Sequence, residues 1–305
     1  MLALLAPGQG SQTPGMLSPW LELPGADERI AAWSESIGLD LATLGTTATA
    51  DEITDTSVTQ PLVVAATLLA FEELTRRGLL AGRPAETTIV AGHSVGEIAA
   101  YAIAGLLSAD DAVSLAATRG SEMATACAAE PTGMAAVLGG DEAEVLARLE
   151  ALDLVPANRN AAGQIVAAGA LSALDKLVED PPAKARVRKL ATAGAFHTHF
   201  MGSALDGYSA AAEAVAAGEP TATLLSNADG QPVASAPDAM TKLVAQLTRP
   251  VRWDLCTETM RARGVTAIVE FPPAGTLVGI AKRELRGVPT YAVKTPADLD
   301  GLAEL

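Results

Sequence analysis

ETTIVAGHSVGEIAAYAIAG, residues 86–105, decides the fold of this chain. The β-branched apolar run at 87–90 predicts a buried strand, and the small apolar residues after position 97 predict a helix. The intervening GHSVG at 92–96 matches G-x-S-x-G in the strand–turn–helix setting that this motif requires. The stretch therefore predicts an α/β fold in which a sharp turn presents a serine above a sheet.

The turn suits a serine nucleophile. A side chain at Gly92 or Gly96 would collide with the neighbouring strand or helix, and the turn lifts the Ser94 hydroxyl clear of the sheet. Unpaired N–H groups at the start of the following helix can hold a developing oxyanion. We predict that Ser94 is the nucleophile; the alternative is a glycine-rich turn with an incidental serine.

Composition narrows the class of protein. The chain has 305 residues, 49% of them hydrophobic but only 3% aromatic, which indicates a globular core packed with Ala, Val and Leu. The net charge of −15 argues against nucleic acid as a partner. Cys127 and Cys256 stand alone, which predicts neither a disulfide framework nor a metal site and favours a reducing cytoplasm. The short apolar start predicts a first strand rather than a signal peptide, and we expect no membrane span.

The first strand, expected at 2–6, ends in the glycine-rich loop PGQGSQ at 7–12. The loop lacks the spacing of a dinucleotide or mononucleotide cradle. In sheets built around a nucleophile turn, one oxyanion N–H follows the serine and the other comes from a separate loop. Val95 and Gln9 are our candidates for these two donors; a plain turn remains the alternative for the loop.

One arginine lies within an apolar helix. A helix is expected at 62–74 after Gln60-Pro61, and a second at 112–123, after a capping box that starts at Ser108. The second helix is almost wholly apolar except for Arg119. A buried or half-buried arginine is costly unless it meets a carboxylate or phosphate, and its planar fork matches a carboxylate. The alternative places the Arg119 head group in water.

The pattern changes after position 132. Six segments follow in the order β-α-β-β-α-β, which is typical of a ferredoxin-like split motif; they are expected at 133–138, 141–152, 154–158, 164–168, 172–178 and 185–190. We expect them to form a small subdomain at 126–192, inserted into a large α/β domain made of 1–125 and 193–305.

The chain has three histidines, and a serine nucleophile needs a base whose pKa is near neutral. We expect His93 to be structural and His199 to be solvated. His197 follows the insert in an apolar setting and is our candidate base, with a satisfied core histidine as the alternative. The group that orients His197 stays open between a carboxylate, a backbone carbonyl and an amide side chain.

Together these motifs resemble the malonyl-CoA:acyl carrier protein transacylases of fatty-acid and polyketide synthesis. The resemblance runs in the family's order from the first strand to about position 282. Its motifs are Pro7-Gly8-Gln9-Gly10-Ser11-Gln12, Gln60-Pro61, Gly92-His93-Ser94-Val95-Gly96-Glu97, Arg119-Gly120, Asn160 with Gly163-Gln164, Ala195-Phe196-His197 and Pro250-Val251-Arg252-Trp253. It implies a hydrolase-like α/β domain with a parallel-sheet core, interrupted by a ferredoxin-like subdomain.

The resemblance also implies roles for single residues. Ser94 and His197 would form a dyad, with the histidine held by a main-chain carbonyl near Gln246. Gln9 and Val95 would form the oxyanion hole, and Arg119 would grip the free carboxylate of malonyl. Three further residues would contact the substrate: Phe196, in the malonyl-selecting form of its motif, and Asn158 and Asn160 on the CoA side.

The implied substrates are malonyl-CoA and the phosphopantetheine thiol of acyl carrier protein, with no bound cofactor and no metal. We further expect a cytoplasmic monomer. The chain departs from the family pattern at Val95, where Leu is frequent, and at Arg159 and 161–162, beside Asn160. Two rival functions stay open: a serine esterase or thioesterase, and a non-catalytic module that binds acyl-CoA or a carrier protein.

Overall fold

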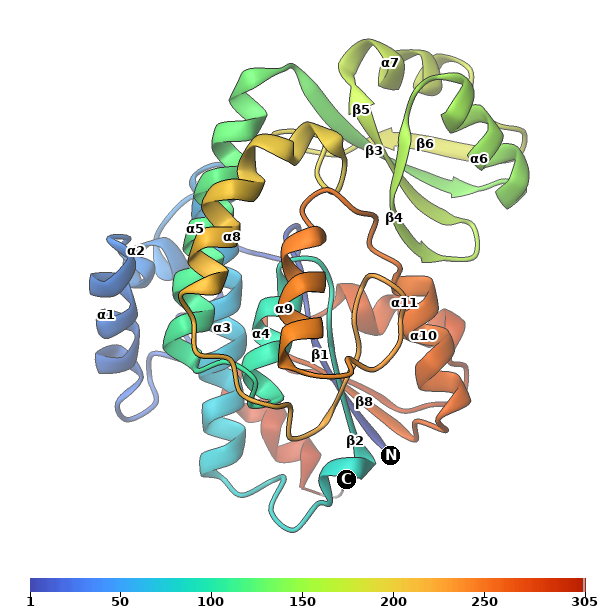
Figure 1. The fold of residues 1–305 in the computed structure, drawn as a ribbon. Helices are drawn as coiled ribbons and strands as arrows, with labels where there is room; N and C mark the ends of the chain where they lie inside the picture. The colour runs from blue at the N-terminus through green and yellow to red at the C-terminus, as the bar shows by residue number, and fades with distance from the viewer. Residues whose placement is uncertain (304) are drawn as a thin grey trace.

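Five parallel strands form the sheet of the larger unit, in the order β7-β2-β1-β8-β9 (Figure 1). The structure is a computed structural model that describes residues 1–303 and 305. The strands are β1 (Leu2–Ala6), β2 (Thr88–Gly92), β7 (Thr223–Leu224), β8 (Ala267–Glu270) and β9 (Thr290–Ala292). Central β1 pairs with β2 on one side and β8 on the other, and all its residues are buried. The parallel-sheet core predicted from the sequence is confirmed.

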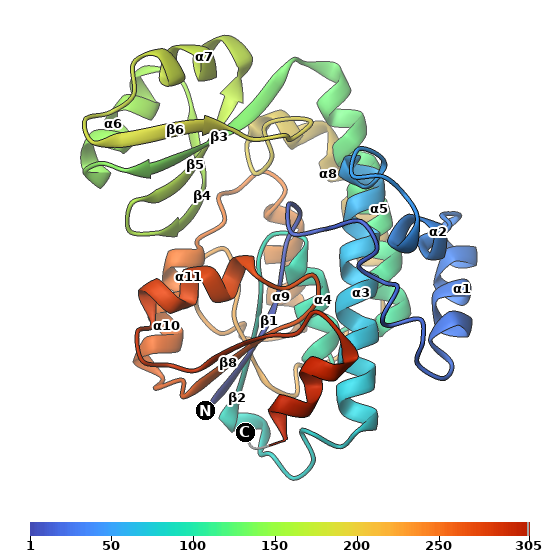
Figure 2. The same ribbon diagram turned by 180° about the vertical axis from the view of Figure 1, so that it is seen from behind.

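Helices cover both faces of this sheet (Figure 2). Because successive strand residues point to opposite faces, Leu2 and Leu4 of β1 join one hydrophobic core and Ala3 and Leu5 join another. The helices that contribute to the first core include α3 (Thr56–Arg76), α4 (Gly96–Ile103), α5 (Ala109–Ala129), α8 (Leu205–Glu213) and α9 (Ala236–Ala245). The second core lies against α10 (Trp253–Ala262) and α11 (Thr276–Glu284).

Short elements complete the larger unit. Two helices, α1 (Ala26–Ile37) and α2 (Leu41–Thr46), lie at the outer side of α3 and α5 (Figure 1). The 3₁₀ segments are η1 (Glu52–Thr54), η2 (Ala85–Thr87), η3 (His199–Ala204) and η4 (Pro296–Leu302).

The predicted start of the helix at 62 is wrong. Helix α3 begins at Thr56, where the side chain of Asp55 accepts a hydrogen bond from the Ser57 N–H and caps the helix. Pro61 lies inside the helix rather than before it. By length and composition α3 could cross a membrane, but 78% of its apolar window is buried inside the fold, as expected of a central core helix.

The smaller unit holds the six elements in the predicted order. They are β3 (Thr132–Gly139), α6 (Glu142–Ala151), β4 (Val155–Ala161), β5 (Gln164–Ala170), α7 (Leu171–Glu179) and β6 (Ala185–Lys189). The strands form an antiparallel sheet in the order β4-β5-β3-β6, with α6 and α7 beside it (Figure 1). This sheet has a hydrophobic core of its own. The fold class is confirmed, and the domain limits at 125/126 and 192/193 stay a prediction.

One backbone contact fixes the smaller sheet above the larger one. Val251 donates its N–H to the Ala157 carbonyl at 2.9 Å, and its own carbonyl accepts the Arg159 N–H at 2.9 Å. Asn158 therefore forms a parallel bridge to Val251, so that β4 ends against the larger unit. The contact brings alternate residues of β4 over the turn that carries Ser94.

Candidate active site

The nucleophile turn has the predicted geometry. Strand β2 ends at Gly92, helix α4 begins at Gly96, and Ser94 between them has a φ of 56°, the left-handed region that L-residues rarely adopt. A Cβ at Gly92 would lie 1.9 Å from the Gly96 carbonyl oxygen, and one at Gly96 would lie 2.3 Å from the Ala6 carbonyl oxygen. Only glycine fits at these two positions, and the strained serine between them is aimed out of the sheet.

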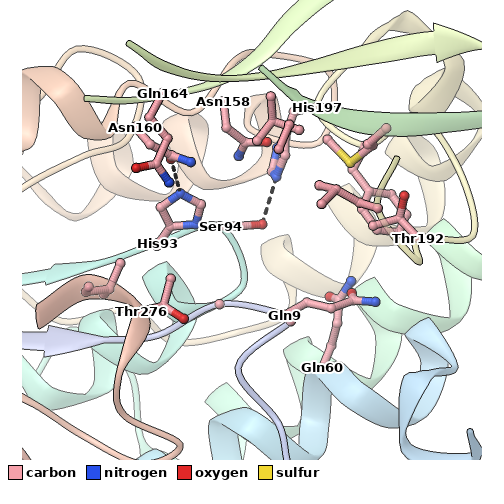
Figure 3. A pocket seen from close by; sticks show the side chains of 18 of the residues that line it. Gln9, Gln60, His93, Ser94, Asn158, Asn160, Gln164, Thr192, His197 and Thr276 are labelled. Atoms are coloured by element: carbon pink, nitrogen blue, oxygen red, sulfur yellow. Dashed lines mark hydrogen bonds between the residues drawn. The ribbon is translucent and has the colours of Figure 1, made fainter. Parts of the chain in front are cut away.

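Ser94 and His197, which are 103 positions apart in the chain, meet at the centre of the site (Figure 3). The Ser94 hydroxyl lies 2.7 Å from His197 Nε2, and His197 Nδ1 lies 2.8 Å from the Gln246 main-chain oxygen. A carbonyl only accepts, so Nδ1 carries the proton and Nε2 accepts from the serine. Of the alternatives left open by the sequence, the orienting group is a backbone carbonyl.

The imidazole is kept neutral. Burial and, to a smaller extent, the nearby positive charge of Arg119 lower the pKa of His197 to about 3. A neutral ring can take the Ser94 proton over the whole physiological pH range.

Two backbone N–H groups stand free near Ser94. Among the described residues, the Gln9 and Val95 N–H groups find no acceptor. Val95 precedes the first turn of α4, where the helix dipole is positive. Gln9 lines the same cavity as Ser94, and its side chain donates to the Thr56 hydroxyl at 3.3 Å. The pair has the donor character of an oxyanion hole.

Arg119 of α5 is 1% exposed, so the alternative that places its head group in water is wrong. Its Nη1 donates to Gln60 Oε1 at 2.7 Å and its Nη2 donates to Gln246 Oε1 at 2.9 Å. Its Nε is buried without a partner among the described residues. Burial lowers the pKa of Arg119 from its ordinary value. The guanidinium is therefore a buried cation held by neutral amides.

The cavity in front of Ser94 has a volume of about 270 Å³. Ser94, His197 and Arg119 line it, together with Phe196 from the loop before η3 and Asn158 and Asn160 from β4. The structure thus brings the predicted substrate contacts to one cavity. Figure 3 shows Gln9 and Gln60 on the side of the cavity opposite Asn158 and Asn160.

The other two histidines lie in different surroundings. His93 borders the cavity, and its Nε2 lies 2.8 Å from Asn160 Oδ1, while its ring packs against Trp253 at 5.6 Å between centroids. His199 is exposed, as expected. Arg159 turns away from the cavity and pairs with Glu142.

Three residues of the site were given no role from the sequence: Gln60, Glu97 and Asn227. Gln60 belongs to the Gln60-Pro61 motif, and Glu97 ends the motif around Ser94. Each is a polar residue in an otherwise apolar helix, and this pattern could have indicated a functional role. Asn227 follows β7 and carried no signal of its own. Among residues 1–303 and 305, no group of three or more His, Cys, Asp or Glu side chains could hold a metal ion.

This fold and site define an acyl-group enzyme of the α/β class, with a serine on a strand–helix turn, a neutral histidine beside it and an arginine in the same cavity. The acyl transferase domain family matches residues 4–297. The malonyl CoA-acyl carrier protein transacylase of Mycolicibacterium smegmatis is 80% identical over 294 residues, which is 95% of this chain and 100% of the relative.

Solved structures agree with this match. The crystal structure of MCAT from Mycobacterium tuberculosis superposes with a TM-score of 0.97 at 75% identity and covers 99% of both chains. The chain also matches the structure of a type II PKS acyl-carrier protein in complex with its malonyl-transacylase. The TM-score is 0.92 at 29% identity, again over 99% of both chains. The chain belongs to the malonyl-CoA:acyl carrier protein transacylase family.

Proposed function

We propose that this chain transfers the malonyl group of malonyl-CoA to the phosphopantetheine thiol of an acyl carrier protein, for fatty-acid or polyketide synthesis in the cytoplasm. Membership of the family supports the reaction, and a related transacylase bound to a carrier protein supports the acceptor. The observation that carries the proposal is the buried Arg119 in the Ser94 cavity, whose Nε has no partner among the described residues. A cation at that place selects an acyl group that ends in a carboxylate.

The first half-reaction loads the enzyme. Ser94 Oγ attacks the thioester carbonyl carbon while His197 Nε2 takes the hydroxyl proton. The negative charge that develops on the carbonyl oxygen is held by the two free N–H groups of Gln9 and Val95, each such donor contributing about 3 kcal/mol to the transition state. The carbon–sulfur bond then breaks, and the CoA sulfur takes the proton from His197.

The second half-reaction transfers the malonyl group from Ser94 to the carrier thiol. The carrier thiol gives its proton to His197 as its sulfur attacks the malonyl-Ser94 ester. The ester carbon–oxygen bond breaks, and Ser94 recovers the proton. The hydrogen bond from Nδ1 to the Gln246 carbonyl keeps the same tautomer available in both directions.

Substrate contacts divide between the two ends of the cavity. The malonyl carboxylate pairs with Arg119, which Gln60 and Gln246 hold in place. Phe196 forms part of the acyl wall, and Asn158 and Asn160 face the CoA or pantetheine arm. The bond between Asn160 and His93 fixes one of these amides.

An acyl-fate assay tests the proposal. The enzyme is mixed with malonyl-CoA, with and without a carrier protein that bears phosphopantetheine, and the products are separated. We expect malonyl-carrier protein as the main product and slow release of free malonate without the carrier. If free malonate forms equally fast with and without the carrier, the chain is a thioesterase.

A further inference from the structure

Glu97 is a buried carboxylate that the proposed reaction does not use. It lies in the first turn of α4, three positions after Ser94, and is fully buried. Its helix is otherwise apolar apart from the Tyr101 hydroxyl. Carboxylates are seldom buried to this degree unless hydrogen bonds hold them, so the partners of Glu97 indicate its role.

The first partner leads to the nucleophile turn. Glu97 Oε1 accepts the Asn227 N–H at 2.6 Å. The Asn227 side chain makes two hydrogen bonds to the nucleophile turn. Its Oδ1 accepts the Ser94 N–H at 2.8 Å, and its Nδ2 donates to the Gly92 carbonyl at 2.7 Å. Glu97 thereby supports the residue that holds Ser94 in its strained conformation.

The second partner leads to the arginine. Glu97 Oε2 accepts from Gln246 Nε2 at 2.5 Å, and the other end of the same amide, Oε1, accepts from Arg119 at 2.9 Å. Gln246 Nε2 also lies 3.1 Å from Asn227 Oδ1 and 3.2 Å from the Ser94 carbonyl oxygen. The main-chain oxygen of Gln246 accepts from His197. One glutamine therefore contacts the nucleophile, the base and the acyl-binding cation.

The orientation of the Gln246 amide decides whether Arg119 is held. An amide has a donor end and an acceptor end, and an ionised carboxylate only accepts. Glu97 therefore requires the Gln246 N–H₂ on its own side, where its 2.5 Å hydrogen bond is the shortest of the three that this nitrogen makes. This orientation leaves the amide oxygen for the guanidinium. With the amide reversed, its N–H₂ would face the N–H groups of Arg119, donor against donor, and the arginine would keep only Gln60.

We propose that Glu97 is a positioning residue for malonyl selection, because its carboxylate fixes the Gln246 amide with the oxygen toward Arg119. This inference rests on the proposed function, in which Arg119 binds the malonyl carboxylate. Glu97 touches no substrate; it acts through the amide, two hydrogen bonds away from the guanidinium.

Glu97→Gln tests the inference without changing the shape of the side chain. The new Oε1 accepts the Asn227 N–H, so the new N–H₂ faces that of Gln246 and favours the reversed amide. We expect kcat/KM for malonyl-CoA to fall at least tenfold, mainly through KM, with acetyl-CoA changed less than threefold. Assays are run at about pH 8, because burial raises the pKa of Glu97 to about 7.

Glu270→Gln is the matched control. Glu270 is also a fully buried carboxylate, but it accepts N–H groups of Gly275, Leu277 and Val278 at the start of α11. We expect this variant to lower Tm while its malonyl-to-acetyl ratio stays within twofold of the parent enzyme. A second variant, Glu97→Asp, keeps a group that only accepts, so its ratio should lie nearer the parent than that of Glu97→Gln.

The outcomes separate the two proposals. A parent enzyme that places no malonyl on Ser94 contradicts the proposed function. An active parent whose malonyl-to-acetyl ratio changes less than threefold in Glu97→Gln contradicts only the role of Glu97. Equal losses of the malonyl-to-acetyl ratio in Glu97→Gln and Glu97→Asp also contradict the role of Glu97. Both losses would then come from damaged packing and not from the orientation of the Gln246 amide.

Discussion

At the scale of single residues, His197 is defined by what its two ring nitrogens contact. Nδ1 donates to a carbonyl and Nε2 faces the Ser94 hydroxyl, so both ring nitrogens are occupied without a carboxylate from the described residues. The residue itself has a φ of 60°, so its backbone, like that of Ser94, is in the left-handed region. Both partners of the proposed proton transfer are therefore held in these conformations by the surrounding structure rather than by local backbone preference.

The low pKa of His197 predicts a pH effect on stability. Burial lowers the pKa to about 3 from an ordinary value of 6.5, so between these values the unfolded chain binds a proton that the folded chain does not. The contribution of the neutral ring to the free energy of unfolding is fully present above pH 6.5. It decreases as the pH drops toward 3, by up to about 1.4 kcal/mol per pH unit. Urea unfolding of the parent and His197→Gln at several pH values measures this slope. A slope equal in the two proteins would contradict it.

Arg119 predicts selectivity. Removing it in Arg119→Ala should lower kcat/KM for malonyl-CoA by about 100-fold or more, since a desolvated charge pair contributes about 3 kcal/mol. Use of acetyl-CoA should be spared or raised, because acetyl has no carboxylate. Steady-state kinetics with both substrates measure the ratio. Arg148→Ala, which breaks an ion pair with Asp180 in the smaller unit, is the control and should change neither. Equal losses for both acyl groups would contradict the assignment.

At the scale of elements, the strand–turn–helix around Ser94 was predictable because its chemistry is local. Glycines at two fixed positions, a β-branched run and a small apolar helix lie within twenty residues. The six elements of the smaller unit were predictable for the same reason, since each has its own periodicity. The start of α3 was not predictable in this way. A proline favours a helix boundary at position 61, whereas the helix is capped upstream by Asp55.

Contacts between elements could not be predicted from the residues alone. Gln60 lies on α3, and its bond to Arg119 on α5 exists only because the two helices pack together. The bonds from Glu97 to Asn227 and Gln246 join residues 130 and 149 positions apart. Nothing in the local pattern specifies such a pairing, whereas the family resemblance did imply the carbonyl near Gln246.

The turn predicts a contrast between two glycines. Gly96→Ala should destabilise the protein by about 3 kcal/mol or more, because its Cβ would lie 2.3 Å from the Ala6 backbone oxygen. Gly279→Ala in α11 meets no atom within 4 Å and should raise stability by up to about 1 kcal/mol through helix propensity. Urea unfolding of both variants makes the comparison. A Gly96→Ala protein as stable as Gly279→Ala would show that the turn is not tight.

At the scale of the whole molecule, the site forms where two units meet. The larger unit supplies Ser94, His197 and Arg119, and strand β4 of the smaller sheet supplies Asn158 and Asn160 to the same cavity. Among the described residues, the large apolar side chains that are exposed all lie on or beside the smaller sheet: Leu138, Leu171, Val178 and Leu190. The smaller sheet has one core of its own, and its other face shares the first core of the larger unit through residues such as Met134 and Val166.

The complete site within one chain predicts a monomer. The predicted functional residues that line the Ser94 cavity all come from this chain. Light scattering coupled to size-exclusion chromatography should give a mass near 31.0 kDa over a range of concentrations. A mass near twice that value at the lowest concentration would contradict the prediction.

The central claim is that an acyl group passes through Ser94, and the mass of the trapped enzyme tests it most directly. After brief mixing with malonyl-CoA, peptide mass spectrometry should locate one malonyl group on Ser94, absent in Ser94→Ala and lost when a carrier thiol is added. An enzyme that transfers malonyl while Ser94 stays unmodified, or a Ser94→Ala protein that transfers it at the parent rate, would contradict the account.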